Sequence, residues 1–235
     1  RKNELVRPKA ANIDLALMTV STVRPVPNTY VLDKLITVCE FKQIEPVIIL
    51  TKTDLKTDDT FTDIYQNAGF TVIQTGKGIE NREEILAVMK GKTSIFIGNT
   101  GVGKSTLLNR LFPDLGLRTA AISDKLGRGR HTTRQVELYP VPGGGYVADS
   151  PGFSSVELEA YEPIRKEELA GCFREFRPYL DGCQFADCSH RKEKGCAVLK
   201  AIDDGKISLS RHESYVMLYE EAMQIPDWQR EDNRK

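Results

Sequence analysis

The feature that most constrains this chain is residues 98–106, which read Gly-Asn-Thr-Gly-Val-Gly-Lys-Ser-Thr. The run has the form G-x-x-x-x-G-K-S, a loop whose backbone N–H groups surround a polyphosphate. The preceding run 92–97 is apolar and β-branched, which predicts a buried strand, and residues 106–112 have helical spacing. A loop in this position turns the N-terminus of the helix toward the same anion. The sequence therefore predicts a nucleotide-phosphate site on an α/β fold.

The loop residues have distinct expected roles. We expect the ammonium group of Lys104 to lie against the outer phosphates, which also makes it a catalytic residue, and the hydroxyl of Ser105 to bind Mg²⁺. The other loop positions expected to bind the nucleotide are Asn99, Thr100, Gly101, Val102, Gly103 and Thr106. The alternative is a glycine-rich turn without a ligand, and the flanking strand and helix argue against it.

Charge balance and apolar content exclude several classes of protein. The 235 residues include 33 Lys and Arg and 33 Asp and Glu, so nucleic-acid binding requires local basic patches. No apolar run reaches the roughly 18 residues of a membrane span, and no secretory signal is visible, so we expect a cytoplasmic protein without a membrane partner. The sequence begins at Arg1 rather than Met, which we interpret as a cut edge.

Short apolar runs alternate with helical patterns along the first part of the chain. The expected strands cover residues 13–20, 46–50, 70–74 and 92–97, and the expected helices cover 28–41, 58–68, 80–90 and 106–112. This alternation predicts a parallel sheet with helices on both faces and ligands at the carboxyl ends of the strands. The runs 136–140 and 146–148 flank three glycines and predict a hairpin.

A second motif, Thr51-Lys52-Thr53-Asp54, follows the strand expected at 46–50. The carboxylate of Asp54 can accept hydrogen bonds from both N1–H and N2–H of guanine, donors that adenine lacks, so we expect Asp54 to select GTP over ATP. We expect Lys52 to lay its stem along the base, with Thr51 completing the motif. The alternative is a strand-end turn with an N-capping Asp. The nearby phosphate loop favours two motifs that serve two ends of one ligand.

The turn Thr75-Gly76-Lys77 follows the strand expected at 70–74. We expect its backbone N–H groups to close over the base, with Thr75 and Gly76 in the site. Because carboxyl ends of parallel strands share one edge of a sheet, this turn, Asp54 and Gly98 should lie close together.

The stretch 113–134 is polar and irregular, with a basic core at 125–134. A loop of this length inside a compact domain is usually functional or disordered. A nucleotide sensor must also lie just after the phosphate-loop helix. We expect Thr132 or Thr133 to act as a catalytic residue that reaches Mg²⁺ and the γ-phosphate, and His131 to position a water. The alternative is a solvated basic loop.

The run Asp149-Ser-Pro-Gly152 ends the second strand of the expected hairpin. We expect Asp149 to bind Mg²⁺ through a water, together with Ser105 and Thr133, and the N–H group of Gly152 to touch the γ-phosphate. The D-x-x-G pattern is common by itself. It gains meaning after a hydrophobic strand in a phosphate-loop protein.

Three of the five cysteines cluster near the C-terminus. The spacing Cys183-x4-Cys188-x-His190-x5-Cys196 offers three thiolates and an imidazole, the ligand set of a structural zinc site. The surrounding segment has little apolar content and would not form a compact knuckle without a metal. Free core thiols or a redox pair are the alternatives. Without an export signal, metal binding is favoured over disulfides.

The rest of the C-terminal segment has helical patterns. Residues 167–176 are amphipathic, and 207–224 predict a final helix whose inward side chains include Tyr215 and Met223.

The motifs follow one another in an unusual order. Conventional GTPases begin with the phosphate loop and end with the base motifs, whereas here the base motifs come first, as in a circular permutation. This order, the segment 127–133 and the cysteine spacing resemble the RsgA family, also called YjeQ or YloQ, over nearly the whole chain. Members of that family are bacterial GTPases that assist small ribosomal subunit assembly.

The resemblance implies two domains. They are a circularly permuted P-loop GTPase domain over residues 1–155 and a small, mainly helical zinc-knuckle domain over 156–235, preceded by an oligonucleotide-binding barrel that is absent here. It implies GTP or GDP with Mg²⁺ as ligands and one structural Zn²⁺ on the three cysteines and the histidine. It also implies a bacterial, cytoplasmic GTP hydrolase that acts as a nucleotide-dependent switch in small ribosomal subunit biogenesis. We expect a monomer.

The resemblance further implies contact with the small ribosomal subunit and its rRNA. Basic residues around the cysteine cluster are the candidates for it: Arg165, Lys166, Arg174, Arg177, Arg191, Lys192 and Lys194.

Two positions bear on the chemistry. Thr51 stands where the family usually has Asn, but a Thr can still bond to neighbouring backbone, so we expect guanine preference to survive. Phe153 replaces the water-orienting Gln of conventional GTPases. Intrinsic hydrolysis is then expected to be slow and to depend on a partner that orders His131.

Two other functions stay open at this point. One is a zinc-stapled RNA-binding module whose nucleotide site is structural and does not hydrolyse. The other is an ATPase, against which Asp54 argues.

Overall fold

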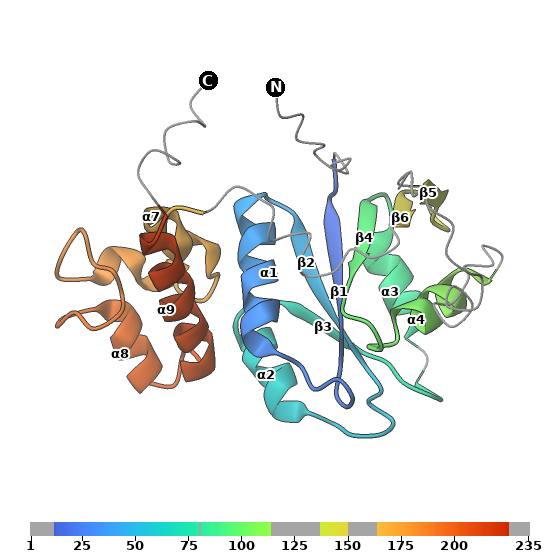
Figure 1. Ribbon diagram of the computed structural model, residues 1–235, viewed down its shortest axis with the longest axis horizontal. Coiled ribbons are helices and arrows are strands. Elements are labelled where there is room, and N and C mark those ends of the chain that lie inside the picture. The colour runs from blue at the N-terminus through green and yellow to red at the C-terminus, as the bar shows by residue number, and fades with distance from the viewer. Residues whose placement is uncertain (1–11, 80, 114–136, 150–163, 226–235) are drawn as a thin grey trace. The chain divides into compact units, whose positions relative to one another are not determined.

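The computed structural model (Figure 1) describes residues 12–79, 81–113, 137–149 and 164–225. The chain forms two compact units. The first comprises Arg1–Val26, Val47–Thr57 and Ile73–Val156, and the second comprises Pro27–Pro46, Asp58–Val72 and Glu157–Lys235. The chain therefore passes between the units five times. Among the helices in the described ranges, none combines the length and the apolar character needed to cross a membrane.

Within the described residues, one six-stranded sheet has the strand order β3-β2-β1-β4-β6-β5. Its strands are β1 (Leu15–Ser21), β2 (Glu45–Thr51), β3 (Thr71–Gln74), β4 (Thr93–Ile97), β5 (Glu137–Pro140) and β6 (Tyr146–Asp149). β4 pairs in parallel with both β1 and β6, and Leu15 lies opposite Ser94. β5 and β6 form the expected antiparallel hairpin. The predicted α/β class is confirmed.

The central strands are apolar because both of their faces are covered. Every side chain of β1 except Val20 is buried, and so is every side chain of β2 except Glu45. The predicted helices α3 (Arg82–Met89) and α4 (Lys104–Leu111) supply further residues to the core of the first unit. That core contains Leu15, Leu17, Val47, Ile49, Ile73, Ile85, Met89, Phe96, Leu107, Leu111, Phe112, Val141 and Val147. It fixes the strand ends from which the loops of the site emerge.

The second unit is helical. It contains α1 (Thr29–Phe41), α2 (Asp59–Asn67), α7 (Lys166–Leu169), α8 (Ala197–Asp203) and α9 (Leu209–Met223), with 3₁₀ turns η2 (Ala170–Cys172) and η3 (Arg177–Gly182). Asn28 caps α1 by accepting the Val31 N–H at 3.1 Å, and Asp58 caps α2 by accepting the Phe61 N–H at 3.1 Å. Although α1 and α2 lie between strands in the sequence, they belong to the same unit as the C-terminal helices.

The proposed domain boundary after residue 155 lies outside the described residues, and it stays a prediction. Two helical predictions are wrong in part. The run 167–176 is helical only through Cys172, because Phe173 is extended (φ −100°, ψ 105°) and ends the 3₁₀ turn. Met223 was expected to face inward, but it is 50% exposed, and its neighbour Ala222 is buried instead.

A buried arginine joins three parts of the second unit. Arg211 of α9 pairs with Asp33 of α1 at 2.5 Å and with Glu175 at 2.7 Å. Arg211 and Asp33 are each 1% exposed, and Glu175 is 9% exposed. The hydroxyl of Tyr65 on α2 donates to Asp33 at 2.9 Å. Burial raises the pKa of Asp33, whereas the charge of Arg211 opposes that rise. Each charge in this group therefore depends on its partners.

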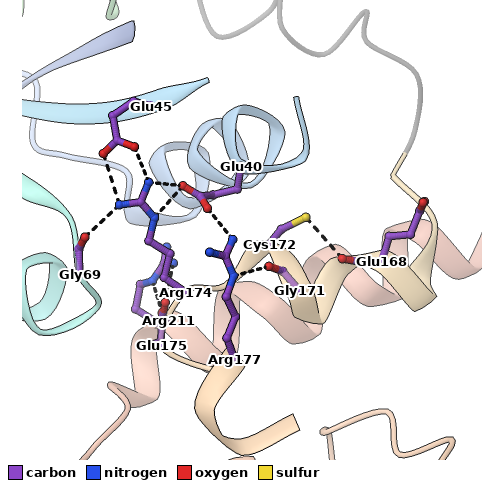
Figure 2. Close-up of polar contacts among 10 residues, drawn as sticks. All are labelled: Glu40, Glu45, Gly69, Glu168, Gly171, Cys172, Arg174, Glu175, Arg177 and Arg211. Atoms are coloured by element: carbon purple, nitrogen blue, oxygen red, sulfur yellow. Dashed lines mark hydrogen bonds and ion pairs between the residues drawn. The ribbon is translucent and has the colours of Figure 1, made fainter. Parts of the chain in front are cut away.

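A second arginine cluster joins the same segments (Figure 2). Arg174 donates to Glu40 at 2.8 Å, to Glu45 at 2.8 Å and to the carbonyl oxygen of Gly69 at 3.0 Å. Arg177 also pairs with Glu40, at 2.6 Å. The segment after α7 is thereby connected to the end of α1, the start of β2 and the turn after α2.

Candidate nucleotide site and metal centre

The first base motif begins at Thr51, the last residue of β2, and this residue contacts the phosphate loop directly. Its hydroxyl lies 2.5 Å from the carbonyl oxygen of Val102 and 3.1 Å from that of Val20. The side chain is 5% exposed, so these bonds are shielded from water. The expectation that a Thr here bonds to neighbouring backbone is confirmed. Thr51 links β1, β2 and the phosphate loop.

Lys52 makes a second link between the same segments. Its ammonium group donates to the carbonyl oxygens of Val23 at 3.1 Å, Arg24 at 2.5 Å and Gly101 at 2.8 Å. The hydroxyl of Thr22 in turn donates to the carbonyl oxygen of Lys52 at 2.9 Å. The ammonium group is held by the loop after β1 and by the phosphate loop. The position of its stem along a base stays a prediction.

Asp54 lies against Gly76 in the turn Thr75-Gly76-Lys77, which is the second base motif. A Cβ atom on Gly76 would overlap the Asp54 carboxylate and come within 2.8 Å of the Asp54 nitrogen, so only glycine fits there. The N–H of Thr53 donates to the carbonyl oxygen of Thr75 at 3.3 Å, and the N–H of Thr75 donates to that of Leu50 at 2.8 Å. The structure thus brings the two base motifs together, as the sequence predicted.

The phosphate loop turns back on itself before α4. Gly103 precedes the helix with φ 94°, a left-handed conformation that glycine adopts without strain. The ammonium group of Lys104 lies 3.5 Å from the carbonyl oxygen of Gly98, so the side chain folds back over the loop. Ser105 and Thr106 follow in the first turn of α4. The loop and the helix N-terminus therefore have the arrangement that binds a polyphosphate.

The remaining predicted residues lie partly outside the description. His131, Thr132, Thr133 and Gly152 fall outside the described residues, and their roles stay predictions. Asp149 is the last residue of β6, which runs parallel to β4 with Ala148 opposite Ile95. Its backbone is therefore at the same sheet edge as the phosphate loop.

The predicted zinc ligands converge in the second unit. The ligand atoms of Cys183, Cys188, His190 and Cys196 all lie within 4.8 Å of one another. His190 Nδ1 is 3.5 Å from the Sγ atoms of both Cys183 and Cys196, which are 3.8 Å apart. Tetrahedral Zn²⁺, with bonds of about 2.3 Å to sulfur and about 2.0 Å to nitrogen, requires separations of about 3.5 Å for S···N and 3.8 Å for S···S. The residues fit this ion.

Neighbouring groups support metal binding by this cluster. The N–H groups of Ala197 and Leu199 point to the Sγ atoms of Cys183 and Cys196 at 3.4 and 3.5 Å, the kind of outer hydrogen bond that orients a metal ligand. These donors belong to α8, a helix that the sequence analysis did not predict. Burial lowers the pKa of His190 and so favours the neutral ring, the form that binds metal.

The final helix fixes the loop that carries His190. His212 Nε2 lies 2.7 Å from the carbonyl oxygen of His190, and the Tyr215 hydroxyl donates to that of Ser189 at 2.9 Å. His212 is 7% exposed and is thus a buried packing residue of α9.

Sequence reasoning missed the contribution of Val23 and Arg24 to the nucleotide site. Both act through backbone carbonyl groups that Lys52 binds, and a backbone acceptor leaves no signal in residue type.

Comparisons with known proteins support the same conclusions as this geometry. The family described as RsgA GTPase matches residues 1–159. The small ribosomal subunit biogenesis GTPase RsgA of Caldanaerobacter subterraneus is 42% identical over 226 residues, which cover 94% of this chain and 75% of that protein. The protein of the same name from Bacillus subtilis is 43% identical over 224 residues, 92% of this chain and 74% of the relative.

Two solved structures also match. The crystal structure of YjeQ from Thermotoga maritima has a TM-score of 0.75 at 33% identity and covers 96% of this chain and 77% of that one. The structure of YloQ, described as a circularly permuted GTPase, has a TM-score of 0.76 at 34% identity and covers 96% of this chain and 74% of that one.

Proposed function

The chain belongs to the RsgA GTPase family, and from this premise we propose that it hydrolyses GTP as a nucleotide-dependent switch in small ribosomal subunit maturation. The observation that supports it most strongly is the pair of links from Thr51 and Lys52 to the phosphate loop. These links tie the start of the motif that ends at Asp54 to the loop proposed to bind the phosphates, although the two motifs stand in the reverse of their order in conventional GTPases. The proposed partner implies a cytoplasmic location.

The residues divide into two groups at the two ends of the nucleotide. Thr51, Lys52, Asp54, Thr75 and Gly76 form the base end, where the carboxylate accepts the two guanine donors. The loop residues 98–106 form the phosphate end.

A divalent ion belongs at the phosphate end. Ser105, Thr133 and Asp149 are the residues that would hold Mg²⁺, which would neutralise charge on the β- and γ-phosphates.

Hydrolysis is proposed to depend on a partner. His131 would position the attacking water, because Phe153 offers no polar group for that role. Binding of GTP would order the loop around residues 118–134 and the run 149–152. That change would reorient the zinc module on the ribosome, and hydrolysis would release the protein.

We propose that the cysteine cluster holds one structural Zn²⁺. Its four protein ligands leave no open coordination position, so the ion stabilises the loop and takes no part in hydrolysis.

The rRNA contact is proposed to lie on residues 183–196, the loop that carries the four proposed metal ligands and is called the metal loop below. Two of the basic candidates, Arg174 and Arg177, are occupied in ion pairs with glutamates of the same unit. Lys192 and Lys194 are exposed between the last two metal ligands. Glu193 fixes that backbone by accepting the N–H groups of residues 189, 191 and 192 at 3.0–3.1 Å. Burial alone would raise the pKa of Glu193, but these bonds and the Ser189 hydroxyl outweigh it and give a value of about 2.

GTP hydrolysis measured with and without small ribosomal subunits tests the proposal. Slow turnover that the subunits stimulate is expected, and His131→Ala should keep nucleotide binding but lose the stimulation. Unchanged stimulated turnover in this variant would remove His131 from the mechanism. Absence of phosphate release under all conditions would instead support the non-hydrolysing module.

Subunit affinity measured with GDP and with a non-hydrolysable GTP analogue tests the switch. Equal affinities would contradict it. The double variant Lys192→Glu and Lys194→Glu should weaken subunit binding and reduce its salt dependence, whereas Lys200→Glu, an exposed lysine on α8, should not.

A further inference from the structure

We propose that Arg110 is a positioning residue for guanine recognition, an inference that rests on the proposed function of the base site. Arg110 is near the C-terminal end of α4, in the helix that starts at Lys104. Its Nη1 donates to the carbonyl oxygen of Gly76 at 3.0 Å. It therefore holds the turn after β3 that is proposed to cover the base, although it is outside every motif that predicts nucleotide binding.

The Gly76 peptide is confined on two sides. Asp54 lies against its Cα, where a Cβ atom would overlap the carboxylate. On the carbonyl side, Arg110 shares the acceptor with the N–H of Ile79, which donates at 3.3 Å and closes the turn. In a trans peptide the C=O and the following N–H point in opposite directions. By holding the Gly76 carbonyl, Arg110 sets the direction of the Lys77 N–H.

A reciprocal bond fixes the same two segments. Arg82, the first residue of α3, donates to the carbonyl oxygen of Leu111 at the end of α4, at 3.0 Å. The side chain of Asn81 donates to the carbonyl oxygen of Gln74 at 2.6 Å, at the start of the turn. The end of α4 and the connection from β3 to α3 are thus tied by donors from both sides.

The helix α4 therefore connects both ends of the proposed ligand. Its first residues belong to the phosphate site, and Arg110 holds the base turn. Its eight residues span about 12 Å, since an α-helix rises about 1.5 Å per residue. A short rigid helix of this kind sets the spacing between the phosphate cradle and the base turn.

The chemistry of the base separates this role from that of Asp54. Asp54 is proposed to accept from N1–H and N2–H, whereas N–H groups of the turn can only donate, and the acceptor on guanine is O6. Adenine carries an amino group at that position, which is a donor. If the N–H groups of the turn point in the wrong direction, the hydrogen bonds to O6 should therefore weaken more than the hydrogen bond from N2–H to Asp54.

The test compares nucleotides whose bases lack different groups of guanine. GDP is measured against the diphosphate of 2-aminopurine riboside, which lacks O6 and with it the N1–H donor, and against inosine diphosphate, which lacks only the 2-amino group. Arg110→Gln should lower GDP affinity about fivefold and leave affinity for the 2-aminopurine nucleotide within about twofold, as for one hydrogen bond. Arg110→Lys, which keeps a donor, should recover part of the loss. At saturating GTP, kcat should not change.

Arg82→Gln is the matched control, because it removes a bond to the end of α4 without touching Gly76. It should leave unchanged the ratios of the affinity for GDP to the affinities for the 2-aminopurine nucleotide and for inosine diphosphate. Equal losses for GDP and the 2-aminopurine nucleotide in Arg110→Gln, or no loss, would overturn the inference. If Arg110→Gln fails to unfold cooperatively, the ratios of Arg110→Lys decide. A wild-type protein without preference for GDP over ADP would instead contradict the proposed base site itself.

Discussion

The two units of this protein are stabilised internally by different interactions. The first unit has a core of apolar strand and helix residues, and its candidate site lies in the loops that follow the strands. The second unit buries Arg211, Asp33 and Glu175 beside its aromatic residues and gathers four side chains that could hold a metal ion in one loop region. Removing one methylene from an apolar core costs about 0.5–1.5 kcal/mol. A buried charge or metal ligand without its partner is costly. The second unit should therefore respond more sharply to single changes.

Metal removal should have the largest effect and should separate the two units. Zinc binding contributes about 10–16 kcal/mol in small zinc-finger peptides, so Cys188→Ser or a strong chelator should unfold the metal loop and lower the free energy of unfolding, measured in urea, by several kcal/mol. GDP affinity should stay within about twofold, because no zinc ligand belongs to the first unit.

Zinc content measured by metal analysis, together with GDP titration, checks this prediction. Cys172→Ala is the control, since Cys172 is a buried thiol outside the cluster, and it should keep one zinc. Simultaneous loss of zinc and nucleotide binding in Cys188→Ser would show that the two units do not respond separately.

The substitution Arg211→Met should follow in size. It leaves Asp33 and Glu175 buried without their partner, which typically costs about 3–5 kcal/mol. Arg177→Met is the control: the Arg177 side chain is 50% exposed, and Glu40, whose side chain is 6% exposed, keeps its pair with Arg174, so the loss should be about 1 kcal/mol or less. Urea unfolding at neutral pH measures both, and similar losses in the two variants would contradict the contrast between buried and exposed pairs.

Lys104→Ala should act on the first unit alone. Removal of a charge-assisted contact to the phosphates should reduce GDP affinity by about 100-fold or more. Lys90→Ala, an exposed lysine at the end of α3, should bind GDP normally. Titration with a fluorescent GDP analogue measures both variants. Unchanged zinc content and thermal unfolding in Lys104→Ala would confirm that the effect stays in one unit, and retained GDP affinity would contradict the role of Lys104.

The smallest effect concerns Glu221 on α9. Burial would raise its pKa, but hydrogen bonds from Tyr30 and Lys34 of α1 outweigh this and lower it. A lowered carboxyl pKa stabilises the fold above the unfolded value of about 4.3 and loses that contribution as the pH falls through the folded value. NMR titration of the zinc-loaded protein should give a midpoint for Glu221 below 4.3. Lys34→Met should raise that midpoint, and an unchanged one would exclude the ion pair.

The sequence predicts the first unit well because ligand binding restricts residue type. The phosphate loop needs glycine at Gly103 for its left-handed turn, and Gly76 has no room for a side chain beside Asp54. The cluster of three cysteines and a histidine is equally predictable from the sequence, since spacing alone identifies Cys183 and His190 as partners.

The grouping of α1 and α2 with the C-terminal helices was not predictable in the same way. Asp33 looks like any charged residue of a helix, and its partner Arg211 is 178 positions further along the chain. No local pattern records such a pairing. Met223 was misplaced for a related reason, because the spacing of apolar residues on α9 does not distinguish it from its buried neighbour Ala222.

The five passages of the chain between the units have a consequence for biosynthesis. Asp33 leaves the ribosome 178 residues before Arg211, a delay of about 9 to 36 seconds at 5–20 residues per second. During that interval the nascent α1 carries an acidic group whose counterion has not yet been translated. The helical unit can therefore complete its buried ion pairs only after Arg211 has been translated, long after its first helix has been made.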